Sequence, residues 1–284
     1  MNEVMACVDA LGHPLAVCDG AAWAARTLGA RLMFLHVLER HPERASSIDF
    51  SGQIGLGAQE SVLNELAELD ARRSALAQKE GRRILEGMRQ RALESGIDDI
   101  ELRQRHGELA DTVVELETST TLVVMGEHSH PPGTGRFLDH HLEQVIRATH
   151  RPVLVVPRHT FQAPRSFALA YDGSETAQAL LRQVTQNPLL QGLPCQVIRV
   201  GPADPAMQAE LDAGAQALRE AGMQAEAQSL VGDIEQVLPM HLATQGLGLL
   251  VMGAYGHSRI RHLIVGSTTT ALLRNSEVPV LVLR

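Results

Sequence analysis

Leu122-Val123-Val124-Met125-Gly126 and Leu249-Leu250-Val251-Met252-Gly253 are two versions of one short apolar run that ends in Met-Gly. They lie 127 positions apart in a chain of 284 residues. The same offset, without a gap, superposes three further features: His130 on His257, Arg147 on Arg274, and residues 152–155 on 279–282. A repeat at a fixed offset indicates that one structural unit is present twice.

Each copy alternates short apolar runs with helical stretches. We predict strands near residues 4–8, 31–37, 100–105, 121–125 and 152–156 in the first copy, and near 167–171, 194–200, 224–230, 247–252 and 279–283 in the second. Most of these runs do not alternate strictly between apolar and polar residues, as expected for strands buried on both faces. The order of elements therefore predicts an α/β fold with two doubly wound, parallel five-stranded sheets.

The repeat also predicts the domain boundaries. We place a first domain at residues 1–157, a linker at 158–165 and a second domain at 166–284. The first domain has about 38 extra residues after its second strand. Of these, 42–57 are typical of a loop and 58–95 of one long or broken helix. That helix is either a solvated helix on the face of the sheet or an arm that binds a partner, and the first is the simpler interpretation.

Composition excludes several classes of function. Aromatic residues make up only 3% of the chain and the formal charge is −8, so neither a stacking surface for single-stranded nucleic acid nor a basic patch for duplexes or membranes is expected. The three cysteines form no CxxC pair, and no apolar stretch is long enough to span a bilayer. We expect a cytoplasmic protein that contacts neither nucleic acid nor membrane, in which Cys7 is a buried apolar residue.

The most informative stretch follows the fourth strand of the second copy and has the spacing Gly253-x2-Gly256-x9-Gly266-Ser267. Glycines allow a sharp turn off a parallel strand and a close approach of backbone to a ligand. A helix beginning at Gly266-Ser267-Thr268 would offer free N–H groups to a phosphate. The pattern is neither a P-loop nor a GxGxxG turn. The alternative is that these glycines only shape the connection between strand and helix.

Together with Tyr171-Asp172-Gly173-Ser174 and the terminal strand at 278–282, this pattern resembles the universal stress proteins, here as a tandem of two domains. The resemblance implies the adenine nucleotide alpha hydrolase-like fold, with the last strands of the two domains meeting as in a dimer, so that the chain forms an internal pseudo-dimer. It also implies ATP or a related adenine nucleotide as ligand of the second domain.

The resemblance further implies which residues bind the nucleotide. Asp172, with backbone near Ala170 and Val200, would hold the adenine. Met252, Gly253, Gly256 and His257 would line the ribose and phosphates, with Ser258 in the same loop, and Gly266, Ser267 and Thr268 would bind the phosphates. Asp172 has an alternative role, in which the Asp-Gly pair forms a turn that caps the following helix.

The first copy has lost this pattern. At the 127-residue offset, Gly256 corresponds to Ser129, Gly266 to Asp139 and Ser267 to His140. An aspartate at the helix start would repel phosphate, so we do not expect the first domain to bind ATP in the same way.

The first copy is instead rich in histidines: His128, His130, His140, His141 and, at the end of the third strand, His106. They are either a weak signal for a metal site or a polar loop, and we predict no metal site.

Three functions remain open from the sequence. A nucleotide-responsive binding module is our first expectation. An enzyme that slowly hydrolyses ATP or phosphorylates itself, with Mg²⁺, is the second, although no catalytic base is evident. The third is a scaffold that binds proteins, with a metal site in the first domain. Two chains could also associate as a homodimer, and the sequence names no protein partner.

Overall fold

The computed structural model describes residues 2–10, 12–39, 56–127, 139–157, 160–202, 204–254 and 267–284, with side chains except at 56–63, 175 and 267. Ten strands form where the sequence predicts them. They are β1 (Glu3–Cys7), β2 (Arg31–Leu38), β3 (Ile100–His106), β4 (Thr120–Gly126), β5 (Val153–Val156), β6 (Phe167–Ala170), β7 (Cys195–Val200), β8 (Ala225–Leu230), β9 (Leu250–Gly253) and β10 (Val280–Leu283).

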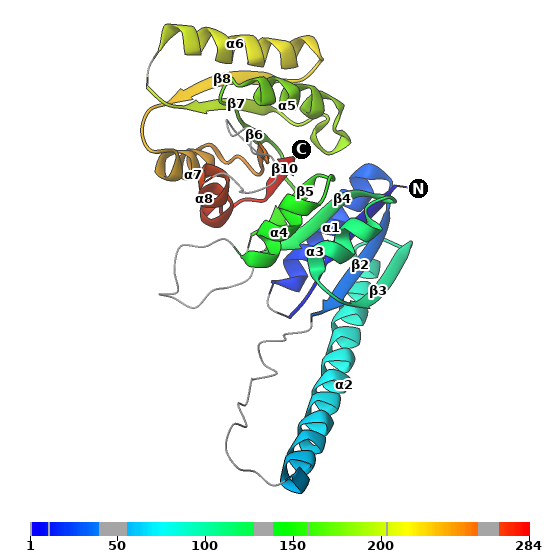
Figure 1. The fold of residues 1–284 in the computed structure, drawn as a ribbon. Helices are drawn as coiled ribbons and strands as arrows, with labels where there is room; N and C mark the ends of the chain where they lie inside the picture. The colour runs from blue at the N-terminus through cyan, green and yellow to red at the C-terminus, as the bar shows by residue number, and fades with distance from the viewer. Residues whose placement is uncertain are drawn as a thin grey trace.

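The ten strands belong to one continuous sheet with the order β3-β2-β1-β4-β5-β10-β9-β6-β7-β8. Within each half the neighbouring strands pair in parallel, whereas β5 and β10 pair antiparallel, with Leu154 opposite Leu281. The predicted meeting of the two last strands in an internal pseudo-dimer is therefore confirmed. Because the two parallel sheets hydrogen-bond through this pair, they form a single mixed sheet (Figure 1).

Helices cover both faces of the sheet. They are α1 (Pro14–Leu28), α2 (Leu56–Glu94), α3 (Leu109–Leu116), α4 (His140–Ala148), α5 (Glu175–Gln186), α6 (Pro205–Glu220), α7 (Ile234–Gln245) and α8 (Ser267–Asn275), with a 3-10 turn, η2, at Pro188–Leu190. Successive residues of a strand point to opposite faces. In β1, Val4 and Ala6 face the core under α1, α2, α5 and α6, whereas Met5 and Cys7 face the core under α3, α4, α7 and α8.

The segment predicted as a long or broken helix is one continuous helix, α2, of 39 residues. Its C-terminal part packs on the sheet through Leu85, Met88 and Ala92, which are at most 5% exposed. Its N-terminal part projects away from the body of the molecule (Figure 1). The predicted loop at 42–57 lies almost entirely outside the described residues.

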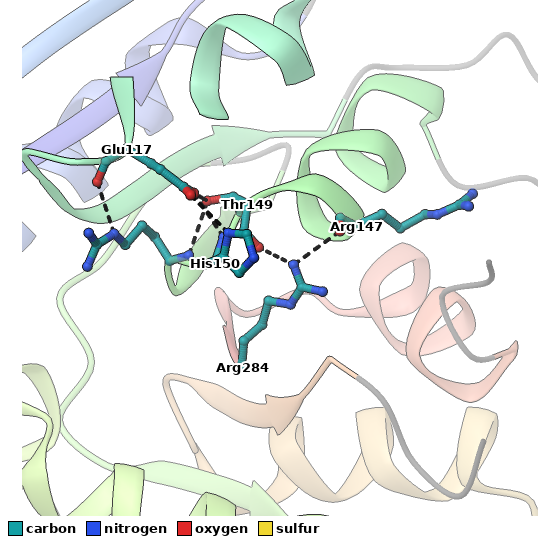
Figure 2. Close-up of polar contacts among 6 residues, drawn as sticks. Glu117, Arg147, Thr149, His150 and Arg284 are labelled. Carbon is teal, nitrogen blue, oxygen red and sulfur yellow. Dashed lines mark hydrogen bonds and ion pairs between the residues drawn. The ribbon is translucent and has the colours of Figure 1, made fainter. Parts of the chain in front are cut away.

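The two halves also contact each other outside the sheet. On one face, the ring of Trp23 in α1 lies 5.6 Å from that of Phe161, which precedes β6. On the other face, the guanidinium of Arg284, after β10, points at the end of α4 and donates to the main-chain oxygens of Arg147 and Thr149 (Figure 2). The junction therefore combines a strand pair, an aromatic contact and a polar contact.

Candidate functional site

Three strands of the second half end side by side at one edge of the sheet. β9, β6 and β7 are consecutive neighbours and run parallel, so their carboxyl ends meet where α/β sheets bind ligands. Four of the predicted binding residues lie at these strand ends: Ala170, Val200, Met252 and Gly253. Met252 is 4% exposed, and the other three are partly exposed. The structure therefore brings these four residues to a common edge.

Asp172 shapes the turn between β6 and α5. Its Oδ1 accepts hydrogen bonds from the backbone N–H of Ser174 (3.0 Å) and from the Ser174 hydroxyl (2.7 Å). Ser174 in turn caps α5, because its Oγ accepts from the N–H of Ala177 at 3.2 Å. Asp172 therefore takes part in the turn, as in its alternative role, but the cap of α5 is Ser174, which Asp172 holds. The adenine contact of Asp172 stays a prediction.

An ion pair that the sequence analysis did not identify supports this turn. Arg199, near the end of β7, lies 3.5 Å from the carboxylate of Glu210 in α6, and the Arg199 side chain is only 14% exposed. Gly173 has φ of 78°, and a Cβ there would lie 2.6 Å from Glu210 Oε2 and 3.2 Å from Arg199 Nη1. Burial, with the Glu210 and Asp172 carboxylates, raises the pKa of Tyr171. The one feature of the sequence that could have indicated this ion pair is the positive charge of Arg199 near the end of the predicted strand at 194–200.

The helix after the glycine-rich loop begins where the sequence predicts. α8 starts at Ser267, and Thr268 in its first turn is exposed. The first N–H groups of a helix have no partners within the helix and form the positive end of its dipole. Gly256, His257, Ser258 and Gly266 lie outside the described residues, as does the side chain of Ser267, so their predicted contacts with the nucleotide stay predictions.

The corresponding helix of the first half begins differently. Asp139 precedes α4, is 3% exposed, and its Oδ1 accepts from the N–H of His141 at 2.9 Å. A carboxylate of the chain itself therefore occupies the start of this helix. Asp139 therefore caps α4 where the second half has Gly266. That the first domain does not bind ATP in the same way stays a prediction.

The strand ends of the first half are also filled by backbone. The connection from β1 to α1 has six residues, against four between β6 and α5. The longer connection brings the carbonyl oxygen of Gly12 so close to Gly126, at the end of β4, that a Cβ there would lie 2.0 Å from it. Asp9 holds this connection, since its Oδ1 accepts from the N–H of Gly12 at 2.7 Å. This difference was not predicted, although the two added residues between β1 and α1 are visible in the sequence.

Comparisons with known proteins agree with the repeat and the fold. The model of the universal stress protein family matches the chain twice, at residues 1–157 and 165–284. This chain belongs to the universal stress protein family. A universal stress protein of Synechocystis is 32% identical over 291 residues, which cover all of both chains.

Solved structures of universal stress proteins share the fold. One from Archaeoglobus fulgidus is 17% identical, covers 99% of this chain and 96% of its own, and has a TM-score of 0.67. A shorter universal stress protein solved in complex with cAMP is 22% identical and covers 43% of this chain and 98% of its own, at a TM-score of 0.37. The full-length likeness shows that the tandem arrangement of this universal stress protein has a counterpart of known structure.

The histidines of the first half do not form a metal site within the described residues of this universal stress protein. His141 Nδ1 lies 3.2 Å from the carboxylate of Glu39, which also accepts from the N–H of Leu109 at the start of α3. His106 contacts Gln78 of α2. His128 and His130 lie outside the described residues. His141 and His106 therefore contact neighbouring elements, whereas His140 is exposed beside His141.

The three thiols are buried, as predicted for Cys7. Burial, with a smaller effect of the Asp9 carboxylate, raises the pKa of Cys7 to about 12, and burial raises those of Cys18 and Cys195 to about 12 as well. A thiol with such a pKa is almost entirely protonated at neutral pH and is therefore a poor nucleophile.

A cleft of about 220 Å³ lies at the junction of the two halves, away from the start of α8. It is lined by the ends of β4 and β5, including Glu127 and Pro157, and by residues from Leu273 to Val278 at the end of α8. At the 127-residue offset, Pro157 corresponds to Arg284 and α8 to α4. The cleft is thus the counterpart of the place that the Arg284 side chain fills on the other side of the junction.

None of the helices in the described ranges is long and apolar enough to cross a membrane.

Proposed function

We propose that the second half of this chain binds ATP or a related adenine nucleotide and that the protein acts as a nucleotide-responsive binding module. The adenine would lie near Asp172 and the backbone at Ala170 and Val200. The phosphates would lie at the start of α8, near Ser267 and Thr268, with the Gly253–Gly266 loop around the ribose and phosphates.

The charge of the chain favours this mode of binding. A protein with a formal charge of −8 has no excess of cations with which to attract a polyanion. The N–H groups and the dipole at a helix start attract phosphate without a charged side chain. The start of α8 and the ends of β6, β7 and β9 are available for such a site.

The contrast between the two halves carries the proposal. In the first half, the carboxylate of Asp139 caps α4 and the Gly12 carbonyl lies against Gly126. In the second half, the connection after β6 is two residues shorter and the residue before α8 is a glycine. The start of α4 thus already holds a carboxylate and the neighbouring strand ends hold backbone, whereas the second half has a glycine before α8 and a shorter connection, so we assign the nucleotide to the second half.

The variant Gly266→Asp tests the assignment because it copies Asp139 into the second half. A carboxylate about 4 Å from a phosphate costs several kcal/mol at an effective dielectric constant near 20, so we expect ATP affinity to fall about 100-fold or more. The matched control is Gly87→Asp, the same substitution at an exposed position of α2 where a Cβ has open space. Isothermal titration calorimetry gives the affinities, and circular dichroism checks the fold. An unchanged affinity in Gly266→Asp would reject the assignment.

Single-turnover hydrolysis with Mg²⁺ separates the module from its rivals. Tight binding without turnover supports the module. Turnover that is lost in Gly266→Asp supports a slow ATPase or a self-phosphorylating enzyme, for which His257, Ser258, Ser267 and Thr268 are candidate acceptors. If the wild-type protein binds no adenine nucleotide, the proposal is overturned and a protein-binding scaffold is the remaining function.

A further inference from the structure

The N-terminal part of α2 forms an exposed arm, which we define as residues 64–80. Every residue from 64 to 77 is exposed, a length of about 21 Å at 1.5 Å per residue. The apolar contacts of α2 with the core begin after the arm, near Leu85 and Met88. Gln78, at the end of the arm, makes polar contacts with His106 and Gln104 of β3. A solitary helix of this length is marginally stable in water, so the arm lacks the packing that usually stabilises a helix.

The arm carries a stripe of leucines. Leu66, Leu69 and Leu76 are 37%, 43% and 67% exposed. Their spacings of three and seven, with Arg73 between the last two, place them on one face of the helix at the a and d positions of a heptad. Three solvent-exposed leucines on one face are typical of a helix that packs against another helix.

The charges of the arm divide into two blocks. The first block, 64–70, has only acidic charges: Glu65, Glu68 and Asp70. The second block, 71–80, is mainly basic, with Arg72, Arg73 and Lys79 and the single acid Glu80. Within the helix, Glu68 pairs with Arg72 at 3.5 Å and Asp70 with Arg73 at 3.8 Å. Both pairs are exposed and so contribute little. The arm is therefore acidic toward its N-terminal end and basic toward its C-terminal end.

We propose that the arm binds the arm of a second copy of this chain in antiparallel orientation. A helix that is acidic at one end and basic at the other is complementary to itself only when the two copies run in opposite directions, which is the arrangement of a two-fold symmetric dimer. Parallel arms would instead place acid opposite acid and base opposite base.

The leucine stripe gives the register. With the two-fold axis near residue 71, Leu66 faces Leu76 of the partner subunit, and Leu69 faces the aliphatic stem of Arg73 of the partner subunit. The same register places Glu65 near Lys79 of the partner subunit, twice by symmetry. The leucines and the charges at the two ends of the arm match in this alignment, in which Arg72 lies near Arg72 of the partner subunit at the two-fold axis. This inference is independent of nucleotide binding.

Sedimentation of the full-length chain tests the association. We expect a monomer–dimer equilibrium, and we expect the double variant Leu66→Gln/Leu76→Gln to raise its dissociation constant at least tenfold. The matched control is Leu93→Gln, which replaces a leucine of α2 with the same 37% exposure outside the arm. Thermal unfolding checks that the body remains folded. A wild-type chain that stays monomeric at several hundred micromolar, or a dimer that the double variant leaves intact, would overturn the proposal.

Charge reversal tests the register. Glu65→Lys and Lys79→Glu should each weaken the homodimer severalfold, because like charges then meet at both ends of the interface. An equimolar mixture of the two variants should restore association, since opposite charges meet again in the heterodimer. Restoration is specific to this pairing, and its absence would reject the register.

Spin labels test the orientation. A label at Asn64, which is exposed, would be displaced from its partner by about 21 Å along the axis of an antiparallel pair centred at residue 71. In a parallel pair the two labels would instead lie level with each other across the interface. A short distance would contradict the antiparallel arrangement.

Discussion

The side chain of Arg284, at the end of the second half, donates a hydrogen bond through Nη1 to the main-chain oxygen of Arg147, in the last turn of α4 of the first half, at 3.1 Å (Figure 2). The same nitrogen also donates to the oxygen of Thr149. The last carbonyl groups of a helix lack partners within the helix and form the negative end of its dipole. A guanidinium therefore satisfies them and joins the halves.

Removal of this guanidinium should loosen the junction. We expect Arg284→Met, which keeps most of the aliphatic stem, to lower the free energy of unfolding by about 1–2 kcal/mol, because the helix carbonyls lose a charged donor. Urea denaturation measures the loss. Arg182→Met, at an exposed position of α5, is the control and should change stability little. Equal stability of the two variants would show that the Arg284 contact contributes nothing.

An arginine introduced at position 157 should place its guanidinium in the cleft beside α8. Because Pro157 corresponds to Arg284, we expect Pro157→Arg to be about 1 kcal/mol more stable than Pro157→Ala, with donors directed at the end of α8. The alanine variant accounts for the loss of proline rigidity, which acts through the unfolded chain. Thermal unfolding of both variants decides, and an arginine variant no more stable than the alanine one would contradict the prediction.

The carboxylate of Glu117 should make the free energy of unfolding depend on pH in the acidic range. Burial alone would raise its pKa, but the backbone N–H of His150, the Thr149 hydroxyl and the His150 ring together lower it below the ordinary 4.5. The backbone and hydroxyl contacts are 2.9 and 2.8 Å long (Figure 2). A lowered pKa in the folded state means that the stabilisation is fully present above about pH 4.5 and is lost as the pH falls through the folded-state value.

We therefore expect Glu117→Gln to cost about 1–2 kcal/mol at pH 7 and progressively less below pH 4.5. Urea denaturation across this range measures the difference between wild type and variant. Glu115→Gln, at an exposed position of α3, which ends just before Glu117, is the control and should show no such convergence. A difference for Glu117→Gln that is constant with pH would rule out the carboxylate as its origin.

The three buried thiols should react slowly with a disulfide reagent. With pKa values of about 12, the folded chain should react with a thiol reagent at pH 8 at least tenfold more slowly than the chain in denaturant, where a thiol has its ordinary pKa near 8.5. Absorbance during reaction with an aromatic disulfide gives both rates. Rapid reaction of even one thiol in the folded protein would show that its burial is transient.

The amino-acid sequence by itself determined the repeat, the ten strands, the start of α8 and the presence of a helical segment near residues 58–95. These features follow from local patterns, because a buried strand needs a short apolar run and a helix needs a suitable first residue. The sequence also indicated that Asp139 replaces a glycine, and the family resemblance implied that the last strands meet.

Only the tertiary structure decided which residues far apart in the chain touch. Several contacts depend on where the sheet places distant elements: the Gly12 carbonyl against Gly126, Arg199 with Glu210, and Arg284 with α4. The same holds for the exposure of Leu66, Leu69 and Leu76 on α2. No periodicity records such contacts, because they depend on how elements pack and on loop length rather than on neighbouring residues. The connection after β1, longer by two residues, fills the strand ends of the first half. Arg284, after β10, hydrogen-bonds to the end of α4 in the first half.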